Sequence, residues 1–177
     1  PDWRPNSDYR DNYITDSESG GGIISEESHE VDYVQWLAGK IDDVYVAAGQ
    51  LSDLDMRSED SALMVMRLKS GVLAEIHVDC VQLGYSRHCK VIGSEGSAEW
   101  TYETGVTITR GPEATDIETL DISPDPNKMY LDEVVDFFES CEGKAKPPVD
   151  GRSALETMRV IEAAHRSVSS HRAEIVQ

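Results

Sequence analysis

The feature that most constrains the fold is a change in the period of the apolar residues along the chain. Over residues 23–38 they recur at helical spacing, between about 44 and 120 they alternate, and after Pro126 the helical spacing returns. A run such as 74–80 places alternate side chains on one face, as a half-buried strand requires. The order helix, strands, helices predicts an α+β fold.

The alternating region is divided by short turns that contain glycine, such as Lys69-Ser70-Gly71 and Glu103-Thr104-Gly105. The strands that we expect lie at 44–50, 62–68, 74–80, 88–92, 97–102 and 106–109. They predict a largely antiparallel sheet of about six strands, with helices packed on one face.

Helices are predicted at 23–38, around 130–141 and around 155–164, and residues 1–20 are expected to form an extended segment or loop. A chain of 177 residues with 39% hydrophobic content has room for one ordinary domain, which we take to be 1–177. The sequence opens at Pro1 rather than Met, and we expect it to be a piece that begins within a longer protein.

The composition argues against several classes of partner. A net charge of -18 without a basic patch disfavours nucleic acid and anionic lipid. No apolar run approaches the roughly 20 residues that span a bilayer. Cys80, Cys89 and Cys141 are odd in number and lack metal-ligand spacing, which indicates a reducing, cytoplasmic setting and no structural metal site.

The second face of the sheet raises the question of oligomerisation. Three moderate helices cover one face but hardly two, so we expect the other face to form a homodimer or homotetramer. The alternative is a solvated face, which Glu75, His77 and Asp79 would suit.

One face of the helix predicted at 23–38 is both ionisable and aromatic. A continuous helix gathers on it Ser25, Glu26, His29, Asp32, Tyr33 and Trp36. Two interpretations remain open: a pocket wall where a histidine exchanges a proton, or residues that bond to loops while Trp36 fills a gap. Glu27 and Glu30 fall within the aliphatic stripe, and the pattern does not account for them.

A metal site was weighed because Glu26 and His29, and also Glu162 and His165, form Glu-x-x-His pairs. Paired motifs of this kind build di-iron sites, but those need two further helices that the strand-like centre does not supply. We therefore predict no metal. His165, like the other remaining histidines His77, His88 and His171, is interpreted as an ordinary surface or satisfied residue.

The stretch Gly20-Gly21-Gly22 to His29-Glu30-Val31-Asp32 resembles the glucose-fructose oxidoreductase, inositol dehydrogenase and rhizopine-catabolism family. The opening 2–13, the turn 91–96 before Trp100, and the last helix around 161–164 resemble the C-terminal domain of the same family. The resemblance covers essentially the whole chain.

The resemblance implies a Rossmann domain before Pro1 that binds NAD or NADP and supplies a catalytic lysine. No glycine-rich dinucleotide loop occurs in this sequence itself. His29 would take part in deprotonating the reacting hydroxyl. The aspartate of the family is replaced by Glu26 or, alternatively, by Ser25.

Substrate-binding roles are expected for Asp32, Arg10, Tyr13 and Tyr33. The implied function is the substrate-side domain of an oxidoreductase acting on a hydroxyl of a sugar, sugar derivative or polyol. The departure at Glu26 and Ser25 favours an alternative, a non-catalytic assembly or ligand-sensing protein that retains the fold.

Overall fold

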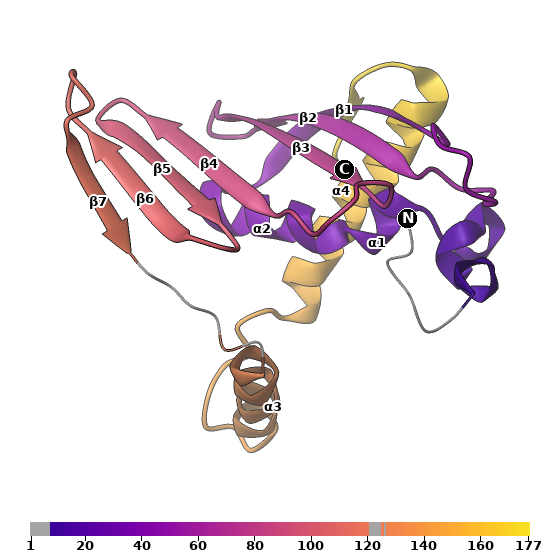
Figure 1. The fold of residues 1–177 in the computed structure, drawn as a ribbon. Coiled ribbons are helices and arrows are strands. Elements are labelled where there is room, and N and C mark those ends of the chain that lie inside the picture. Colours follow the sequence, from indigo (N-terminus) through magenta and orange to yellow (C-terminus); the bar gives the residue numbers. More distant parts are fainter. Residues whose placement is uncertain (1–7, 121–124, 126) are drawn as a thin grey trace. The chain divides into compact units, whose positions relative to one another are not determined.

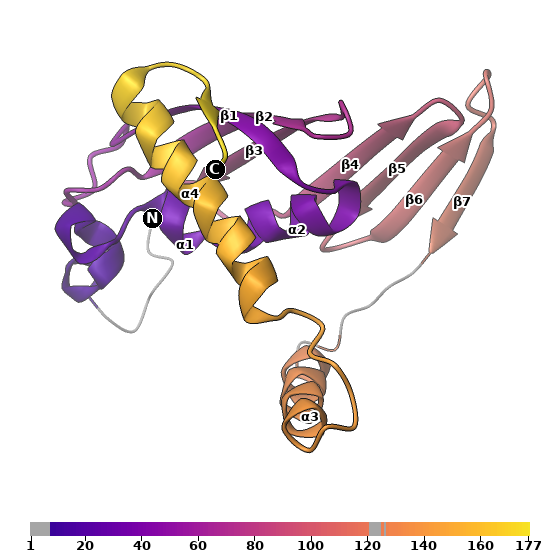
Figure 2. The same ribbon diagram turned by 180° about the vertical axis from the view of Figure 1, so that it is seen from behind.

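The computed structural model describes residues 8–120, 125 and 127–177. The chain forms two compact units, of which unit 1 comprises residues up to Leu83 together with Val149–Gln177 and unit 2 comprises Gly84–Pro148. Each unit has a four-stranded antiparallel sheet (Figures 1 and 2). The predicted α+β fold with antiparallel strands is confirmed, with the strands divided between two sheets.

The sheet of unit 1 has the order β3-β2-β1-β8, from the strands β1 (Ile41–Gly49), β2 (Ser61–Leu68), β3 (Leu73–Asp79) and β8 (Glu174–Ile175). Alternation along β2 is complete, because Met64 and Met66 are each 1% exposed while Leu63 and Val65 between them are more than half exposed. The pattern buries one face and leaves the other open.

Three helices cover the buried face: α1 (Ile23–Glu26), α2 (Ser28–Ala38) and α4 (Gly151–Ser170) (Figures 1 and 2). Ile24, Val31 and Val160 bring one fully buried side chain from each helix into the core. Asp150 fixes the start of α4 by accepting hydrogen bonds from the Arg152 and Ser153 amides. The core of unit 1 therefore joins segments from both ends of the chain.

The helix predicted over 23–38 is in fact two helices. Glu27 has φ -92° and ψ 26°, which ends α1 before α2 begins at Ser28. The change of direction at Glu27 alters which side chains share a face, so the continuous helical wheel drawn from the sequence misplaces residues on either side of it.

The predicted N-terminal loop contains three short 3₁₀ helices, η1 (Tyr9–Asp11), η2 (Tyr13–Thr15) and η3 (Ser17–Ser19). Asp8, Asn12 and Asp16 each cap one of them, accepting from the second backbone amide of the turn. Side chains of Asp and Asn at every fourth position thus convert a polar segment into regular turns.

Unit 2 consists of β4 (His88–Gly93), β5 (Gly96–Thr101), β6 (Gly105–Arg110), β7 (Asp116–Leu120) and α3 (Lys128–Cys141). β7 was not expected from the sequence. The register places Val91, Ala98 and Ile108 in one cross-strand row, which gives the sheet one apolar face.

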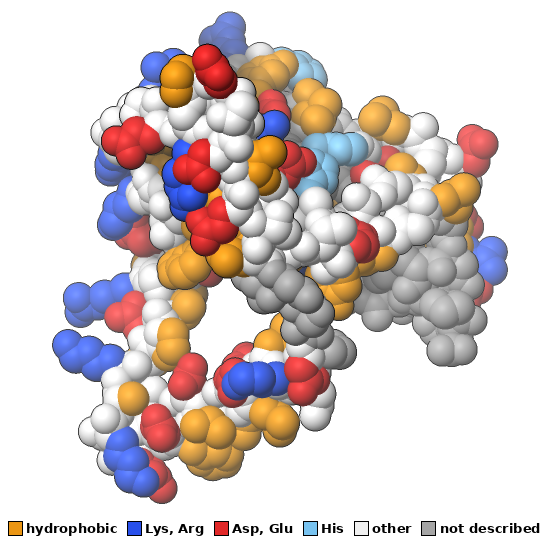
Figure 3. Space-filling view, turned by 60° about the vertical axis from the view of Figure 1, so that its left-hand side comes forward, with side chains coloured by type: hydrophobic (Ala, Val, Ile, Leu, Met, Phe, Trp, Pro, Cys, Tyr) orange, Lys and Arg blue, Asp and Glu red, His pale blue; other side chains and the backbone are white. Residues whose placement is uncertain are grey.

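α3 is amphipathic and exposed. Its large apolar side chains are each more than half exposed: Met129, Tyr130, Leu131, Val134, Val135, Phe137 and Phe138. Figure 3 shows hydrophobic side chains gathered on the lowest part of the view, where α3 lies. In the part of the chain that the structure describes, no helix is both long and apolar enough to cross a membrane.

Candidate functional site

The glycines in the turn before α1 allow neighbouring groups to pack closely against the backbone. A side chain at Gly21 would overlap the backbone carbonyls of Tyr13 and Ile14, and one at Gly22, which has φ +113°, would overlap the Glu59 carboxylate. The Ile23 amide donates to the Glu59 backbone carbonyl, 3.1 Å away, and the Ile24 amide to its side chain, 3.3 Å away. These contacts fix where α1 starts.

His29 lies in the first turn of α2, with 57% of its side chain exposed. Its Nε2 atom is 3.1 Å from Glu27 Oε2 and 3.4 Å from Glu30 Oε1. Hydrogen bonding to these two carboxylates raises the pKa of His29 to about 10, although partial burial opposes the shift. The two glutamates that the sequence pattern left unexplained are thus the groups that contact the predicted catalytic histidine.

Glu26 and Tyr13 are brought together, because the Tyr13 hydroxyl donates to the Glu26 carboxylate. The contact joins η2 to the end of α1, so two predicted site residues that are far apart in the sequence are neighbours. No ion pair joins Glu26 to His29 among the described residues.

Ser25, the other candidate for the aspartate of the family, pairs with a histidine from α4. Its Oγ atom is 3.0 Å from His165 Nε2. His165 therefore has a hydrogen-bond partner, which lies 140 positions away in the sequence and could not be found from local spacing. His77 also has a carboxylate neighbour, since its Nε2 is 3.5 Å from Asp79 Oδ2.

Asp32 contacts α4. The Thr157 hydroxyl, on a residue only 6% exposed, donates to Asp32 Oδ1 at 2.8 Å, and Gln35 donates to the same Thr157 oxygen at 3.0 Å. The observed contact of Asp32 therefore ties α2 to α4. Its role toward substrate stays a prediction.

The remaining predicted site residues have contacts of their own. Tyr33 stacks on Trp36 with ring centroids 6.0 Å apart, and Trp36 is 77% exposed, so this tryptophan does not fill a gap within unit 1. The Arg10 guanidinium binds the Asp8 carboxylate through Nε and Nη2, at 2.8 and 2.6 Å. That pairing neutralises the charge of Arg10 locally.

Metal and cofactor binding can be judged from the donor groups. Glu27, His29 and Glu30 each offer one ligand atom, all within 4.8 Å of one another, but exposed acidic groups often gather without a metal. The glycine turn does not fit a dinucleotide, because Gly22 lies against the Glu59 carboxylate, which would repel a pyrophosphate. The described residues therefore offer no dinucleotide cradle at this turn.

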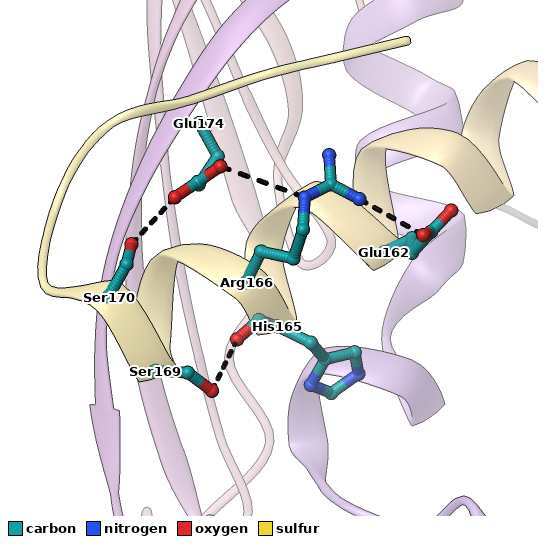
Figure 4. Close-up of a pocket in the computed structure, with 6 residues that line it drawn as sticks. All are labelled: Glu162, His165, Arg166, Ser169, Ser170 and Glu174. Carbon is teal, nitrogen blue, oxygen red and sulfur yellow. Dashed lines mark hydrogen bonds and ion pairs between the residues drawn. The ribbon is translucent and has the colours of Figure 1, made fainter.

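A shallow pocket lies beside the C-terminal half of α4, lined by Glu162, His165, Arg166, Ser169, Ser170 and Glu174 (Figure 4). Arg166 is held by Glu162 at 3.0 Å and by Glu174 at 3.7 Å, and it donates to the Ile175 carbonyl. These bonds connect residues 174–175 to α4. They also occupy the Arg166 guanidinium with contacts inside the protein, which makes it a poor candidate for binding a ligand.

Residues 3–176 match the sequence profile of the oxidoreductase family, C-terminal alpha/beta domain. Inositol 2-dehydrogenase of Salmonella typhimurium is 29% identical over 126 residues, which cover 67% of this chain and 36% of that protein. The oxidoreductase YrbE of Bacillus subtilis is 23% identical over 166 residues, covering 85% of this chain and 47% of that protein. The chain thus spans at most about half the length of these relatives.

Solved structures share the fold. An NAD binding oxidoreductase from Klebsiella pneumoniae superposes with a TM-score of 0.82 at 17% identity, covering 97% of this chain and 55% of that one. The WlbA dehydrogenase from Bordetella pertussis, solved with NADH and UDP-GlcNAcA, gives a TM-score of 0.67 at 21% identity, covering 89% of this chain and 46% of that one.

Proposed function

This chain belongs to the oxidoreductase family whose C-terminal alpha/beta domain it matches, and from that premise we propose that it is the substrate-side domain of an NAD(P)-dependent enzyme. The substrate class that we propose is a hydroxyl of a sugar, sugar derivative or polyol. The WlbA structure contains NADH and a sugar nucleotide, and the Salmonella relative is named for inositol, which supports this class.

The observation that carries the proposal is an accessible imidazole on a well-anchored helix. His29 is more than half exposed, while α2 is anchored below it by buried Val31 and by the Asp32–Thr157 hydrogen bond. A group that exchanges a proton with substrate needs both access and a fixed position.

The cofactor belongs to another part of the parent protein in this proposal. Because the glycine turn does not fit a dinucleotide, we place NAD or NADP, together with a lysine, on a Rossmann domain N-terminal to Pro1. A bound nicotinamide supplies hydride transfer. The residues of this chain orient the reacting hydroxyl and move its proton.

The open face of the unit 1 sheet supports a homodimer or homotetramer. Tyr45, Leu63 and Val65 lie on it and are 43%, 55% and 52% exposed. A second copy that covered these side chains would remove apolar surface from water. The three free cysteines fit the reducing, cytoplasmic setting that we propose.

The test uses the full-length parent with a panel of sugars and polyols, NAD and NADP in parallel, and nicotinamide absorbance as the readout. We expect turnover with at least one substrate, and His29→Ala should lower it by about 100- to 10,000-fold with cofactor affinity nearly unchanged. Equal turnover in the variant would remove His29 from the mechanism.

A second candidate function is a non-catalytic assembly or sensing role. The observation that favours it is the engagement of both aspartate replacements, Ser25 with His165 and Glu26 with Tyr13. A parent protein that binds neither NAD nor NADP, measured by calorimetry, would support this role over the enzyme.

A further inference from the structure

The carboxylate contacts of His29 involve only one of its two ring nitrogens. Both carboxylates approach the same ring nitrogen, Nε2, and Nδ1 has no hydrogen bond to any residue that the structure describes. The Glu27 and Glu30 side chains are 31% and 20% exposed, so both are better shielded from water than the imidazole.

The break between α1 and α2 makes this arrangement possible. In a continuous helix a residue two positions before His29 would point away from it. Glu27 instead has φ -92° and ψ 26°, and its carboxylate lies 3.1 Å from Nε2. Glu30, an acidic residue in the first turn, supplies the second carboxylate from α2 itself.

We propose that Glu27 and Glu30 are positioning residues that hold the His29 ring through Nε2, so that Nδ1 exchanges the proton with the substrate oxygen. This inference rests on the proposed function for its substrate. It assigns the positioning role to Glu27 and Glu30 rather than to Glu26 or Ser25, the candidate replacements for the aspartate of the family.

Glu27 and Glu30, which we call the clamp, also set the charge with which His29 enters the reaction. The first turn of a helix disfavours a cation, yet the two carboxylates raise the pKa of His29 to about 10, which makes it imidazolium at neutral pH. In carbonyl reduction the Nδ1 proton would go to the carbonyl oxygen, and a reduced nicotinamide bound to the parent protein would supply the hydride to the carbon. In oxidation the hydroxyl proton returns to Nδ1, so His29 must first be deprotonated, and alkaline pH favours this direction.

Titratable groups on the neighbouring elements are already engaged. Glu26 of α1 bonds to Tyr13 of η2, and His165 of α4 bonds to Ser25. At the other end of α2, Glu156 of α4 pairs with Lys40 and with Arg159. β3 turns the apolar side chains Ile76 and Val78 toward the helices. Glu27 and Glu30 are thus the carboxylates that govern the titration of His29.

The first experiment is an NMR titration of histidine-labelled full-length parent, with the His29 signal assigned by loss in His29→Gln. We expect a midpoint far above the ordinary value of about 6.5, and a return toward that value in Glu27→Gln/Glu30→Gln. Glu27→Asp, which keeps the charge, should retain a raised midpoint. Glu18→Gln, which removes an exposed carboxylate of unit 1 that does not contact His29, should leave it unchanged.

The second experiment measures the pH profile of polyol oxidation in the same proteins. The rate of oxidation should rise with pH as His29 loses its proton. In the double variant this rise should occur at lower pH, in step with the NMR midpoint. An ordinary His29 midpoint in the wild type would overturn the clamp, and an unmoved profile beside a moved midpoint would overturn the proton exchange. A raised midpoint in a protein that turns over no substrate would support the clamp and overturn the proposed function.

Discussion

The two sheets have the same number of strands but very different surroundings. In unit 1, β1, β2 and β3 press one face against three helices, and all the buried hydrophobic side chains that the structure describes lie in this unit. In unit 2, Val91 is 50% exposed and Ile92 is 77% exposed. Backbone pairing of equal extent therefore accompanies a closed core in one unit and an open apolar surface in the other.

The comparison teaches that unit 1 has the means to hold its own structure, whereas unit 2 depends on whatever covers it. Sheets gain most of their stability from packed side chains, and isolated strands with an uncovered apolar face are marginal. In the proposed parent protein, the exposed faces of β4–β7 and α3 are surfaces available to the other domain or to a second subunit.

The sharpest way to break this comparison is to truncate one apolar strand residue in each unit. Met64→Ala in β2, at 1% exposure, should lower the free energy of unfolding of unit 1 by about 2–5 kcal/mol. Val91→Ala in β4 should change stability within about 0.5 kcal/mol. Urea unfolding followed by circular dichroism measures both, and equal effects would show that unit 2 is as well packed as unit 1.

A second test concerns Asp60 of unit 1, a carboxylate that is fully buried and that organises the loop after β1. It accepts hydrogen bonds from the Leu51 amide and from the amide and hydroxyl of Ser52. Burial alone would raise its pKa, but these bonds outweigh burial and lower it. Asp60→Asn should cost about 1–3 kcal/mol at neutral pH.

The pH dependence of this effect follows from the direction of the shift. A carboxyl whose pKa is lower in the folded state stabilises the fold above its unfolded value of about 3.9, and that contribution is lost as the pH falls through the folded value. Wild type and Asp60→Asn should therefore converge in stability in acid. A gap that persists at low pH would mean that the hydrogen bonds do not depend on the charge.

The smallest expected effect comes from a surface pair in unit 2. Arg110 Nη2 lies 2.8 Å from Glu118 Oε2, and both side chains are 45% exposed. Arg110→Ala should leave stability nearly unchanged, and any loss should shrink as salt is added, because solvent and ions screen the pair. A large, salt-independent loss in thermal unfolding would instead indicate that unit 2 relies on this pair.

Much of unit 1 could be predicted from the sequence because its residues are buried in alternation. The strand expected at 74–80 matches β3 at Leu73–Asp79 within a residue at each end, since Ile76 and Val78 face the core. β7 escaped prediction because all five of its residues are exposed, so no burial pattern marks it. The alternation of apolar residues in a sequence reflects which side chains are buried, and it therefore cannot identify a strand whose side chains are all exposed.

The candidate site was only partly predictable for a different reason. The sequence singled out His29 and Glu26, but not the carboxylates that contact His29. A helical wheel assumes a fixed rotation per residue, and the backbone at Glu27 departs from it. Likewise His165 meets Ser25 only because α4 folds back over α1, a long-range contact that local spacing does not encode.

The division of unit 1 between two stretches of the chain bears on how the protein is made. α4 supplies Val160, Ile161 and Ala164 to the core, yet it leaves the ribosome after all of unit 2. Until then, Val44 and Met66 of the nascent sheet lack the part of their cover that α4 supplies, and closing so long a loop slows the final step. During synthesis, the inner face of the unit 1 sheet thus lacks the cover of α4 until residues 151–170 have emerged.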